Sequence, residues 1–379
     1  MGAWQTQPLG DALTFQRGFD ITKDEQCEGP YSVISSSGPK TTHAEFKVHG
    51  PGVVIGRKGS LGTVFYSDAN YWPHDTTLWV KDFHGNDPRF AYYFLQTMEF
   101  ERLDAGASNP SLNRNHIHTI SVRVPPLPTQ RRIAGILSAY DELIENSQRR
   151  IRILEAMARA LYREWIVHFR FPGHENHPRV ASRLGEIPEG WEVKTLGDIA
   201  EEMRRNVRKG ELEDPKPYVG LEHIPRRSLA LDAWETATEL GSNKLEFRRG
   251  EVLFGKIRPY FHKVSVAPFD GLCSADTIVI RARRSEYYAI VVACVSSDAF
   301  VAEASATANG AKMPRANWNV LKKYQVVIPK GKVADRFSAL FADIITQQQA
   351  LILQIQNLRR TRDLLLPRLL SGQVEVEAT

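Results

Sequence analysis

The segment GRKGSLG (56–62) carries side chains that could contact a nucleic acid. It places Arg57, Lys58 and Ser60 in a turn bounded by glycines. Glycine lets the backbone approach a phosphate closely, while Arg and Lys supply charge or paired hydrogen bonds to base edges. The segment lacks the Gly-Lys-Ser/Thr of a phosphate-binding loop, which argues against a nucleotide site. Taken alone, a basic surface hairpin explains the same residues equally well.

A second polar segment, NPSLNRN (109–115), combines amide and basic side chains. Asn and Arg are the side chains that match adenine and guanine edges in the major groove. Turn capping is a serious alternative for the asparagines. The candidate DNA-binding residues of this segment are Asn109, Ser111, Asn113 and Arg114.

The second half of the chain places similar residue types in GEVLFGKIRPYFHKV (250–264) and AKMPRANWN (311–319). Because basic and amide residues occur at matching places in both halves, the set as a whole favours DNA contact over a solvated surface. No single residue of the set does so alone. The candidate residues here are Lys256, Arg258, Lys263, Lys312, Arg315 and Asn317.

Catalytic motifs are missing from the sequence. NPSL (109–112) and DPKPY (214–218) both depart from the Asn/Asp-Pro-Pro-aromatic motif of adenine methyltransferases, whose adjacent prolines shape the pocket. The sequence has no GxSxG, Walker or HExxH motif. His168, His174 and His177 fit no zinc-binding spacing. We therefore expect neither a catalytic site nor a metal site in this chain.

Composition and charge are those of a globular protein with two or three domains. The 379 residues are 42% hydrophobic and 25% charged, and the net charge of +5 permits an anionic partner without proving one. Three scattered cysteines favour neither a disulfide framework nor a zinc ribbon. The longest apolar run, residues 287–295, is far too short to span a bilayer. We expect a cytoplasmic protein that does not enter a membrane.

The longest periodic stretch, residues 128–169, predicts a helix around which the rest of the chain is organised. Its apolar residues recur in alternating steps of four and three, which keeps one stripe of a helix facing a partner helix. Pro128 suits a helix start, and a helix of this length would measure about 60 Å at 1.5 Å per residue. The seam residues are Ile133, Leu137, Tyr140, Ile144, Ser147, Ile151, Leu154, Ala158, Leu161 and Trp165.

A second heptad helix is predicted near the end of the chain. Its seam is Phe337, Phe341, Ile344, Gln348, Leu351, Ile355, Leu358, Arg362, Leu365 and Leu369. Two seam positions are polar, and we expect Pro367 to kink or end the helix. The offset between the seams is 204 residues (337 − 133), and Pro125 and Pro329 are separated by the same offset (329 − 125). Two landmarks in one register indicate a duplication.

The globular regions repeat as well. TLGDIAEE (195–202) repeats PLGDALTF (8–15), QVVIPKGK (325–332) repeats SVRVPPLP (121–128), and GEVLFGKIRPYFHKV repeats GVVIGRKGSLGTVFY (52–66). We expect an α+β fold in which two similar mixed α/β heads are separated by two long antiparallel helices, related by a pseudo-two-fold axis. Such symmetry suits duplex DNA with two half-sites. The expected boundaries are 1–126 (first head), 127–170 (first helix), 171–190 (linker), 191–329 (second head), 330–370 (second helix) and 371–379 (tail).

Over nearly its whole length, the chain resembles the specificity subunit of a Type I restriction–modification system. The segments that carry the resemblance are PPLPTQRRIAGILSAYDELIENSQRRIRILEAMARALYREW (125–165), GEIPEGWEVKTLGDIAE (185–201), GEVLFGKIRPYFHKVSVAPFDGLCSADTIVIR (250–281), VISSSGP (33–39), GPGVVIGRKGSLG (50–62) and NPSLNRNHI (109–117). No single motif is decisive, but all of them in this order, twice over, are specific.

The resemblance implies a non-catalytic subunit with two target-recognition domains, each reading one half of a split double-stranded DNA site. It implies that the two helices form a coiled coil that acts as a ruler between these domains. The implied partners are two methyltransferase subunits and, through them, ATP-driven endonuclease/translocase subunits. We therefore expect no cofactor on this chain, with S-adenosylmethionine, ATP and Mg²⁺ on the partners.

Two other functions remain open from the residues alone. The chain could be a self-contained DNA methyltransferase or nuclease with diverged motifs, although no Gly-rich cofactor loop supports this. It could also be a coiled-coil scaffold that never contacts DNA. If charge reversal at the basic candidates left DNA binding by the complex unchanged, the scaffold would be favoured over a DNA-binding subunit.

Overall fold

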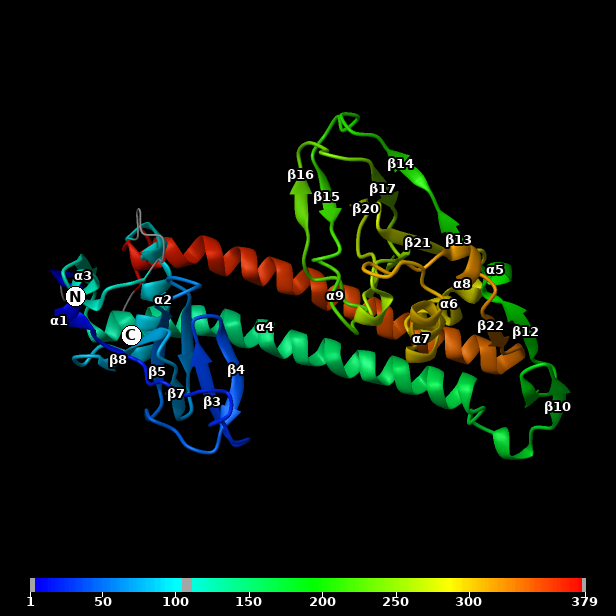
Figure 1. The fold of residues 1–379 in the computed structure, drawn as a ribbon, viewed down its shortest axis with the longest axis horizontal. Coiled ribbons are helices and arrows are strands. Elements are labelled where there is room, and N and C mark those ends of the chain that lie inside the picture. The colour runs from blue at the N-terminus through cyan, green and yellow to red at the C-terminus, as the bar shows by residue number, and fades with distance from the viewer. Residues whose placement is uncertain (1–3, 104–110, 377–379) are drawn as a thin grey trace. The chain divides into compact units, whose positions relative to one another are not determined.

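The computed structural model describes residues 4–103 and 111–376 and divides the chain into two compact units. Unit 1 joins Met1–Leu143 to Leu358–Thr379, and unit 2 is Ile144–Asn357. Two long helices, α4 (Leu127–Tyr162) and α9 (Gly331–Leu370), contribute to both units, because each boundary falls inside one of them (Figure 1).

Head 1 is the globular part of unit 1, residues 1–126. Its elements are β1 (Gln5–Pro8), α1 (Leu9–Ala12), β2 (Thr14–Arg17), β3 (Tyr31–Ser35), β4 (Gly38–His43), β5 (Gly52–Gly56), β6 (Val64–Ser67), β7 (Tyr71–Pro73), β8 (Thr77–Asp82), α2 (Pro88–Gln96), α3 (Arg114–His118) and β9 (Ser121–Val124), with a 3₁₀ turn at Phe100–Leu103. One sheet has the order β2-β8-β5-β6, a second β4-β3-β7, and β1 pairs with β9. Strand β5 reads GVVIG and is buried throughout, because Val53 and Ile55 pack in one hydrophobic cluster and Val54, on the other face, packs in a second.

Head 2 is the globular part of unit 2, residues 191–329. Its elements are β12 (Glu192–Thr195), α5 (Leu196–Ile199), β13 (Ala200–Met203), β14 (Arg205–Val207), β15 (Lys216–Val219), β16 (Glu235–Ala237), β17 (Lys244–Phe247), β18 (Val252–Gly255), β19 (Val264–Val266), β20 (Gly271–Ser274), β21 (Thr277–Ala282), α6 (Tyr288–Val295), α7 (Asp298–Ala306), α8 (Trp318–Leu321) and β22 (Gln325–Ile328), with 3₁₀ turns at Pro259–Phe261 and Ser285–Tyr287.

Head 2 repeats the topology of head 1. Its sheet β13-β21-β18-β19 has the same connectivity as β2-β8-β5-β6, and β12 pairs with β22 as β1 pairs with β9. The parallel pair β15–β20 corresponds to β3–β7. Strands β14 and β17 widen the second sheet of head 2, which has the order β14-β17-β20-β15-β16. The repeat expected from the sequence is therefore present in the strand order itself.

In unit 1, the first part of α4 packs on the last part of α9 in antiparallel fashion. Ile133 and Leu137 of α4 share one core with Leu369 and Leu370 of α9. The same core includes Phe15, from β2, and other side chains of head 1. The helices are thus part of the core of head 1, not a separate rod attached to it.

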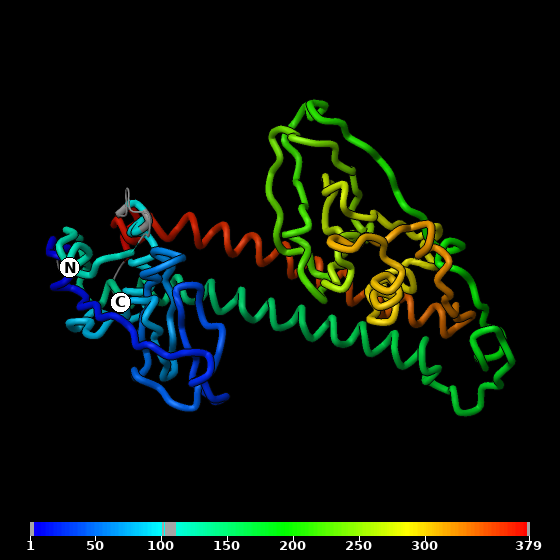
Figure 2. Tube along the Cα trace, viewed as in Figure 1, coloured from blue at the N-terminus to red at the C-terminus, as the bar shows by residue number. Residues whose placement is uncertain are grey.

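Unit 2 shows the same arrangement with the other ends of the helices. Trp165, which follows α4, lies with its ring centroid 6.4 Å from that of Phe337 near the start of α9. Phe337 and Phe341 stack on each other and belong to the core that contains α6, α7 and strands β18 and β21. The trace in Figure 2 follows both helices through this unit.

The seam positions predicted from the heptads are buried or half-buried. Ile133, Leu137, Ile144, Ser147, Ile151 and Ala158 of α4, and Phe337, Phe341, Ile344, Gln348, Leu351, Ile355 and Leu369 of α9, are buried. Tyr140, Leu154, Leu161, Trp165, Leu358, Arg362 and Leu365 are half-buried.

Two local expectations about the helices differ from the structure. The periodic stretch predicts a first helix that reaches 169, but α4 ends at Tyr162 and a π-helical turn, Arg163–Val167, follows. Pro367 does not end α9, because the helix continues to Leu370, and the kink expected at Pro367 stays a prediction. Pro367 lies in the last turn, where its missing N–H removes one intrahelical hydrogen bond, and Gly372 at φ 75° lies just beyond the end.

The linker expected at 171–190 is an ordered part of unit 2. It contains a 3₁₀ turn (His174–Asn176) and the hairpin formed by β10 (Arg179–Ser182) and β11 (Gly185–Pro188). Phe171 and Trp191 at its two ends stack with centroids 5.1 Å apart, and both are buried. Composition predicts a linker here because Pro, Gly and charged residues are frequent, but this pair of aromatic residues anchors the segment.

Within the described ranges 4–103 and 111–376, no single helix has both the length and the apolar composition needed to cross a membrane. One bent pair, Ser285–Val295 with Asp298–Ala306, meets those criteria only when its two members are taken together.

Candidate nucleic-acid interface

In head 1 the fold brings the two polar segments of the sequence side by side. The N–H groups of Arg57 and Lys58, just after β5, donate to the Thr76 carbonyl at 2.8 and 3.1 Å. The Leu112 N–H then donates to the Arg57 carbonyl at 3.0 Å, and Lys58 forms a β-bridge with Ser111. The turn and the polar run, whose bridged residues are 53 positions apart in sequence (111 − 58), therefore form one surface.

The glycine at the start of the turn is required by its geometry. A Cβ on Gly56 would lie 2.0 Å from the Ser60 carbonyl oxygen, which is far inside van der Waals contact. Glycine thus allows the tight turn that presents Lys58 and Ser60. Ser60 is exposed, whereas Arg57 and Lys58 are half-buried.

Head 2 builds the same junction from different residues. The Lys256 N–H donates to the Asp276 carbonyl at 3.0 Å, and the Ala316 N–H donates to the Lys256 carbonyl at 2.8 Å. Ile257 forms the β-bridge with Arg315. Lys256 therefore corresponds to Arg57, and Arg315 corresponds to Ser111. The two heads share a frame but differ in side chains, as expected if each reads its own sequence.

Several basic candidates have internal partners. The Lys256 ammonium donates to the Ala275 carbonyl at 2.5 Å, and that of Lys263 donates to the Leu221 carbonyl. Burial lowers the pKa of Lys263, with Arg226 acting in the same direction. The Arg258 guanidinium donates to the Lys312 carbonyl at 3.5 Å. These groups stabilise the turns. Because their N–H groups already donate to backbone carbonyls, fewer of them are free to contact DNA than the charge of the turns suggests.

In head 1, the Arg57 guanidinium donates to the Asp75 carbonyl at 3.3 Å. Burial and the nearby Arg17 lower the pKa of Arg57, whereas Asp75 opposes this. Within the part of the chain that the structure describes, Asp20, His74 and Asp75 bring carboxylate and imidazole atoms within 4.8 Å of one another. The Asp75 carboxylate already pairs with Arg17 at 2.9 Å, so charge pairing accounts for this cluster.

The asparagine candidates act as helix caps. Asn113 Oδ1 accepts from the Asn115 N–H at 2.9 Å at the start of α3, and Asn317 Oδ1 accepts from the Asn319 N–H at 2.9 Å at the start of α8. The capping alternative is what the structure shows for these carbonyl oxygens. Asn109 lies outside the described residues.

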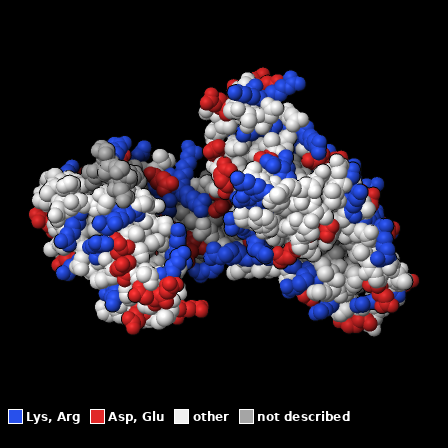
Figure 3. All heavy atoms as spheres, viewed as in Figure 1, with Lys and Arg blue, Asp and Glu red and all other residues white. Residues whose placement is uncertain are grey.

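The exposed members of the candidate set are Ser60, Asn113, Arg114, Lys312, Arg315 and Asn317. These side chains lie on the polar runs and the basic turn, and they are the ones that a DNA surface could reach without rearrangement. Figure 3 shows one face of the molecule, on which basic and acidic side chains are interspersed over both heads.

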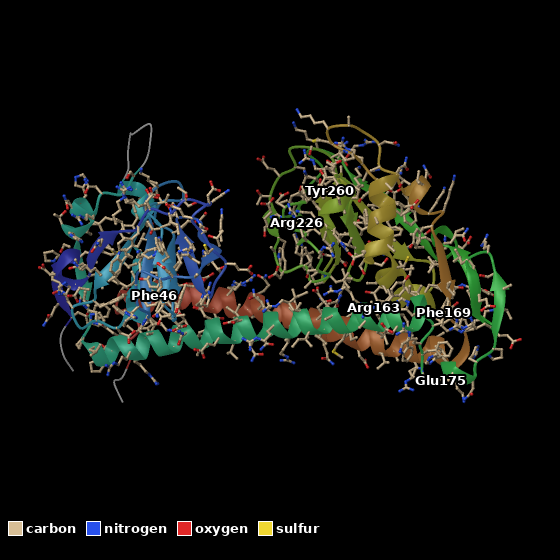
Figure 4. All side chains as sticks on the ribbon, turned by 60° about the horizontal axis from the view of Figure 1, so that its bottom comes forward. Phe46, Arg163, Phe169, Glu175, Arg226 and Tyr260 are labelled. Atoms are coloured by element: carbon tan, nitrogen blue, oxygen red, sulfur yellow. The ribbon has the colours of Figure 1, made fainter. Side chains whose placement is uncertain are left out.

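Two exposed residues of head 2, Tyr260 and Arg226, are absent from the candidate set. The Tyr260 side chain, in the 3₁₀ turn after Arg258, is 56% exposed although it is a large aromatic. Arg226, from a distant loop, lies 4.2 Å from the centroid of the Phe261 ring. Figure 4 labels Tyr260 and Arg226 in head 2. Arg226 reaches this turn through its contact with Phe261 and its β-bridge to Lys263, which no local sequence pattern indicates.

Lowering the pH from about 7.5 to 5.5 should destabilise unit 2 through His262. The ring is buried, its Nε2–H donates to the Ser296 carbonyl at 2.9 Å, and burial lowers its pKa below 6.5. Asp298 raises this pKa, while Arg227 and Arg159 lower it further. Because the folded pKa is the lower one, the neutral ring stabilises the fold above the unfolded pKa, and that contribution is lost as the pH falls toward the folded pKa.

The measurement is the urea midpoint at the two pH values for the wild type and for His262→Gln. The wild type should lose more stability than the variant on acidification. Equal losses would contradict the role given to His262.

The comparisons with known proteins agree with this geometry. Residues 1–156 match the family model described as Type I restriction modification DNA specificity domain. The MjaIX specificity subunit of a Type I restriction enzyme from Methanocaldococcus jannaschii is 26% identical over 310 residues, or 76% of this chain and 69% of the relative. The EcoDI specificity subunit from Escherichia coli is 25% identical over 378 residues, or 91% of this chain and 83% of the relative.

Among solved structures, the S subunit of a Type I restriction–modification system from M. genitalium has a TM-score of 0.64 at 15% identity. The match covers 99% of this chain and 97% of that structure. The duplicated heads and the paired helices therefore define the fold of S subunits. The chain is similar to the specificity subunits of Type I restriction–modification systems in sequence and has their fold, as the sequence resemblance predicted.

Proposed function

We propose that this chain is the DNA-reading specificity subunit of a Type I restriction–modification complex and has no catalytic centre of its own. Each head reads one half of a split double-stranded DNA site, and α4 with α9 sets the gap between the halves. Base contacts supply specificity, and contacts to phosphates supply much of the affinity.

The observation that supports this most strongly is the repeated junction in the two heads. The same backbone frame holds Arg57 beside the polar run in head 1 and Lys256 beside its counterpart in head 2. A duplicated frame with different side chains is what a bipartite, asymmetric DNA site requires. A scaffold that never touches DNA would have no use for two such surfaces.

The partners follow from this role. Two methyltransferase subunits, which carry S-adenosylmethionine, dock on the chain and modify adenines in the two half-sites. Endonuclease/translocase subunits, which use ATP and Mg²⁺, join through them. The complex works in the cytoplasm, where its DNA target lies.

DNA binding by the complex with its methyltransferase should be sensitive to salt and to two lysines of the heads, half-buried Lys58 and exposed Lys312. Lys58→Ala with Lys312→Ala removes one ammonium from each head, and neither side chain has a hydrogen-bond or ion-pair partner within the described residues. For each DNA phosphate that is no longer neutralised, the slope of log affinity against log salt should fall by about one. Lys81→Ala with Lys332→Ala removes the same charge from exposed positions elsewhere and should leave the slope unchanged.

The test is a gel-shift titration over a range of salt with DNA carrying the matched split site and with a scrambled control. Equal binding to matched and scrambled DNA by the wild-type complex would overturn the proposal. Methyl transfer or DNA cleavage by the purified chain alone would instead establish the self-contained enzyme.

A further inference from the structure

A buried carboxylate on α4 connects the helix pair to head 2. Glu155 is 5% exposed, and its Oε1 accepts from the Leu229 N–H at 2.7 Å and from the Ser228 hydroxyl at 2.6 Å, both in a loop of head 2. The same oxygen accepts from Gln348 Nε2 of α9 at 2.9 Å. One carboxylate therefore joins α4, α9 and the head within unit 2.

Unit 1 contains a second connection of the same kind. Asp141 of α4 accepts from Arg362 of α9 at 2.5 Å and, through its other oxygen, from the Tyr93 hydroxyl of α2 at 2.5 Å. Burial raises the pKa of Tyr93, and Asp141 raises it further, so the phenol stays protonated and donates. The connection again runs from α9 through an α4 carboxylate to the head.

The two connections are in one register. The carboxylates lie 14 residues apart on α4 (155 − 141), and their partners lie 14 residues apart on α9 (362 − 348). Fourteen residues are two heptads, so both pairs obey one antiparallel alignment. Gln348 and Arg362 are also the two polar positions of the second seam.

An apolar seam alone does not fix this alignment. A slip of one heptad would bring Leu, Ile and Phe against other apolar residues at small cost. The same slip would separate Glu155 from Gln348 and Asp141 from Arg362. Polar and charged groups would then be left unpaired at buried or half-buried positions, which costs free energy. Polar residues at buried positions of coiled coils specify register by this mechanism.

We propose that the pairs Glu155–Gln348 and Asp141–Arg362 are positioning residues. They fix the register of α4 against α9 and the position of each head on the helices. They thereby determine which DNA gap the complex accepts. This inference rests on the proposed function and deepens it. The four residues contact no DNA in this account and act through the placement of the heads.

The test measures methylation by the chain together with its methyltransferase on DNAs that share both half-sites and differ in gap by one base pair. Gln348→Glu places two carboxylates at hydrogen-bond distance in a buried site. It should lower the ratio of native-gap to altered-gap methylation by about tenfold, a change typical of coupled residue pairs. Gln347→Glu makes the same change on the adjacent, exposed residue and should leave the ratio unchanged.

An unchanged ratio in Gln348→Glu would overturn the inference. If Gln348→Glu does not fold, Arg362→Gln with Arg360→Gln as its exposed control tests the pair in unit 1, with the same loss expected and the same result overturning it. A simple loss of stability would lower methylation at all gaps together. A wild-type complex with no preference for any half-site or gap would refute the proposed function itself. If the wild type and the variant both kept the same preference for the native gap, only the role of the polar pairs in fixing the register would be refuted.

Discussion

Deleting residues 145–151 from α4 together with residues 352–358 from α9 should shorten the preferred DNA gap by about three base pairs. Seven helical residues span about 10 Å at 1.5 Å each, and a base pair rises about 3.4 Å along DNA. Both deletions fall between the two polar pairs, so Asp141–Arg362 and Glu155–Gln348 can form as before. Removing whole heptads also keeps the apolar seams in phase.

Methylation of DNA with the original gap should fall at least about 100-fold, because one head loses its half-site and base-pair contacts are worth about 1–3 kcal/mol each. The preferred bases in each half-site should not change. A deletion in α4 alone puts one polar pair seven residues out of register and should reduce methylation at every gap. If the double deletion kept the original gap, the helices would not be the ruler.

Phe341→Ala should lower the free energy of unfolding of unit 2 by about 3–5 kcal/mol, the usual cost of removing a buried phenylalanine. The ring is 1% exposed, stacks on Phe337 and lies in the core that also contains α6 and α7 of head 2. The substitution would therefore leave a cavity where α9 packs against α6 and α7 of head 2. Loss of the α9 packing should loosen the head as well as the helix.

Urea denaturation of the purified chain, followed by circular dichroism, measures this change. Leu340→Ala alters the preceding residue, which is 41% exposed, and should cost about 1 kcal/mol or less. Similar shifts in the two variants would show that the seam does not anchor head 2.

The long helices and the repeat could be predicted because their signals are local or periodic. The four-and-three spacing from Ile133 to Trp165 reports one face of a helix, whatever the fold around it. The common offset of 204 residues revealed the duplication, and the strand orders of the two heads reproduce it. The turn at Gly56 was recognisable because a tight turn needs glycine at that place.

The remaining features depend on contacts between distant segments. The ammonium groups of Lys256 and Lys263 are engaged by the carbonyls of Ala275 and Leu221, which no local pattern indicates. Asp141 and Glu155 lie next to the seam, where the heptad pattern suggests solvated charges. Their importance appears only when α9 and the heads supply the partners.

The most direct test of the account is the methylome of cells that express this chain with its methyltransferase. We expect methylated adenines in two different half-sites separated by one constant gap. Methylation at a single continuous site, or at half-sites with variable spacing, would contradict it.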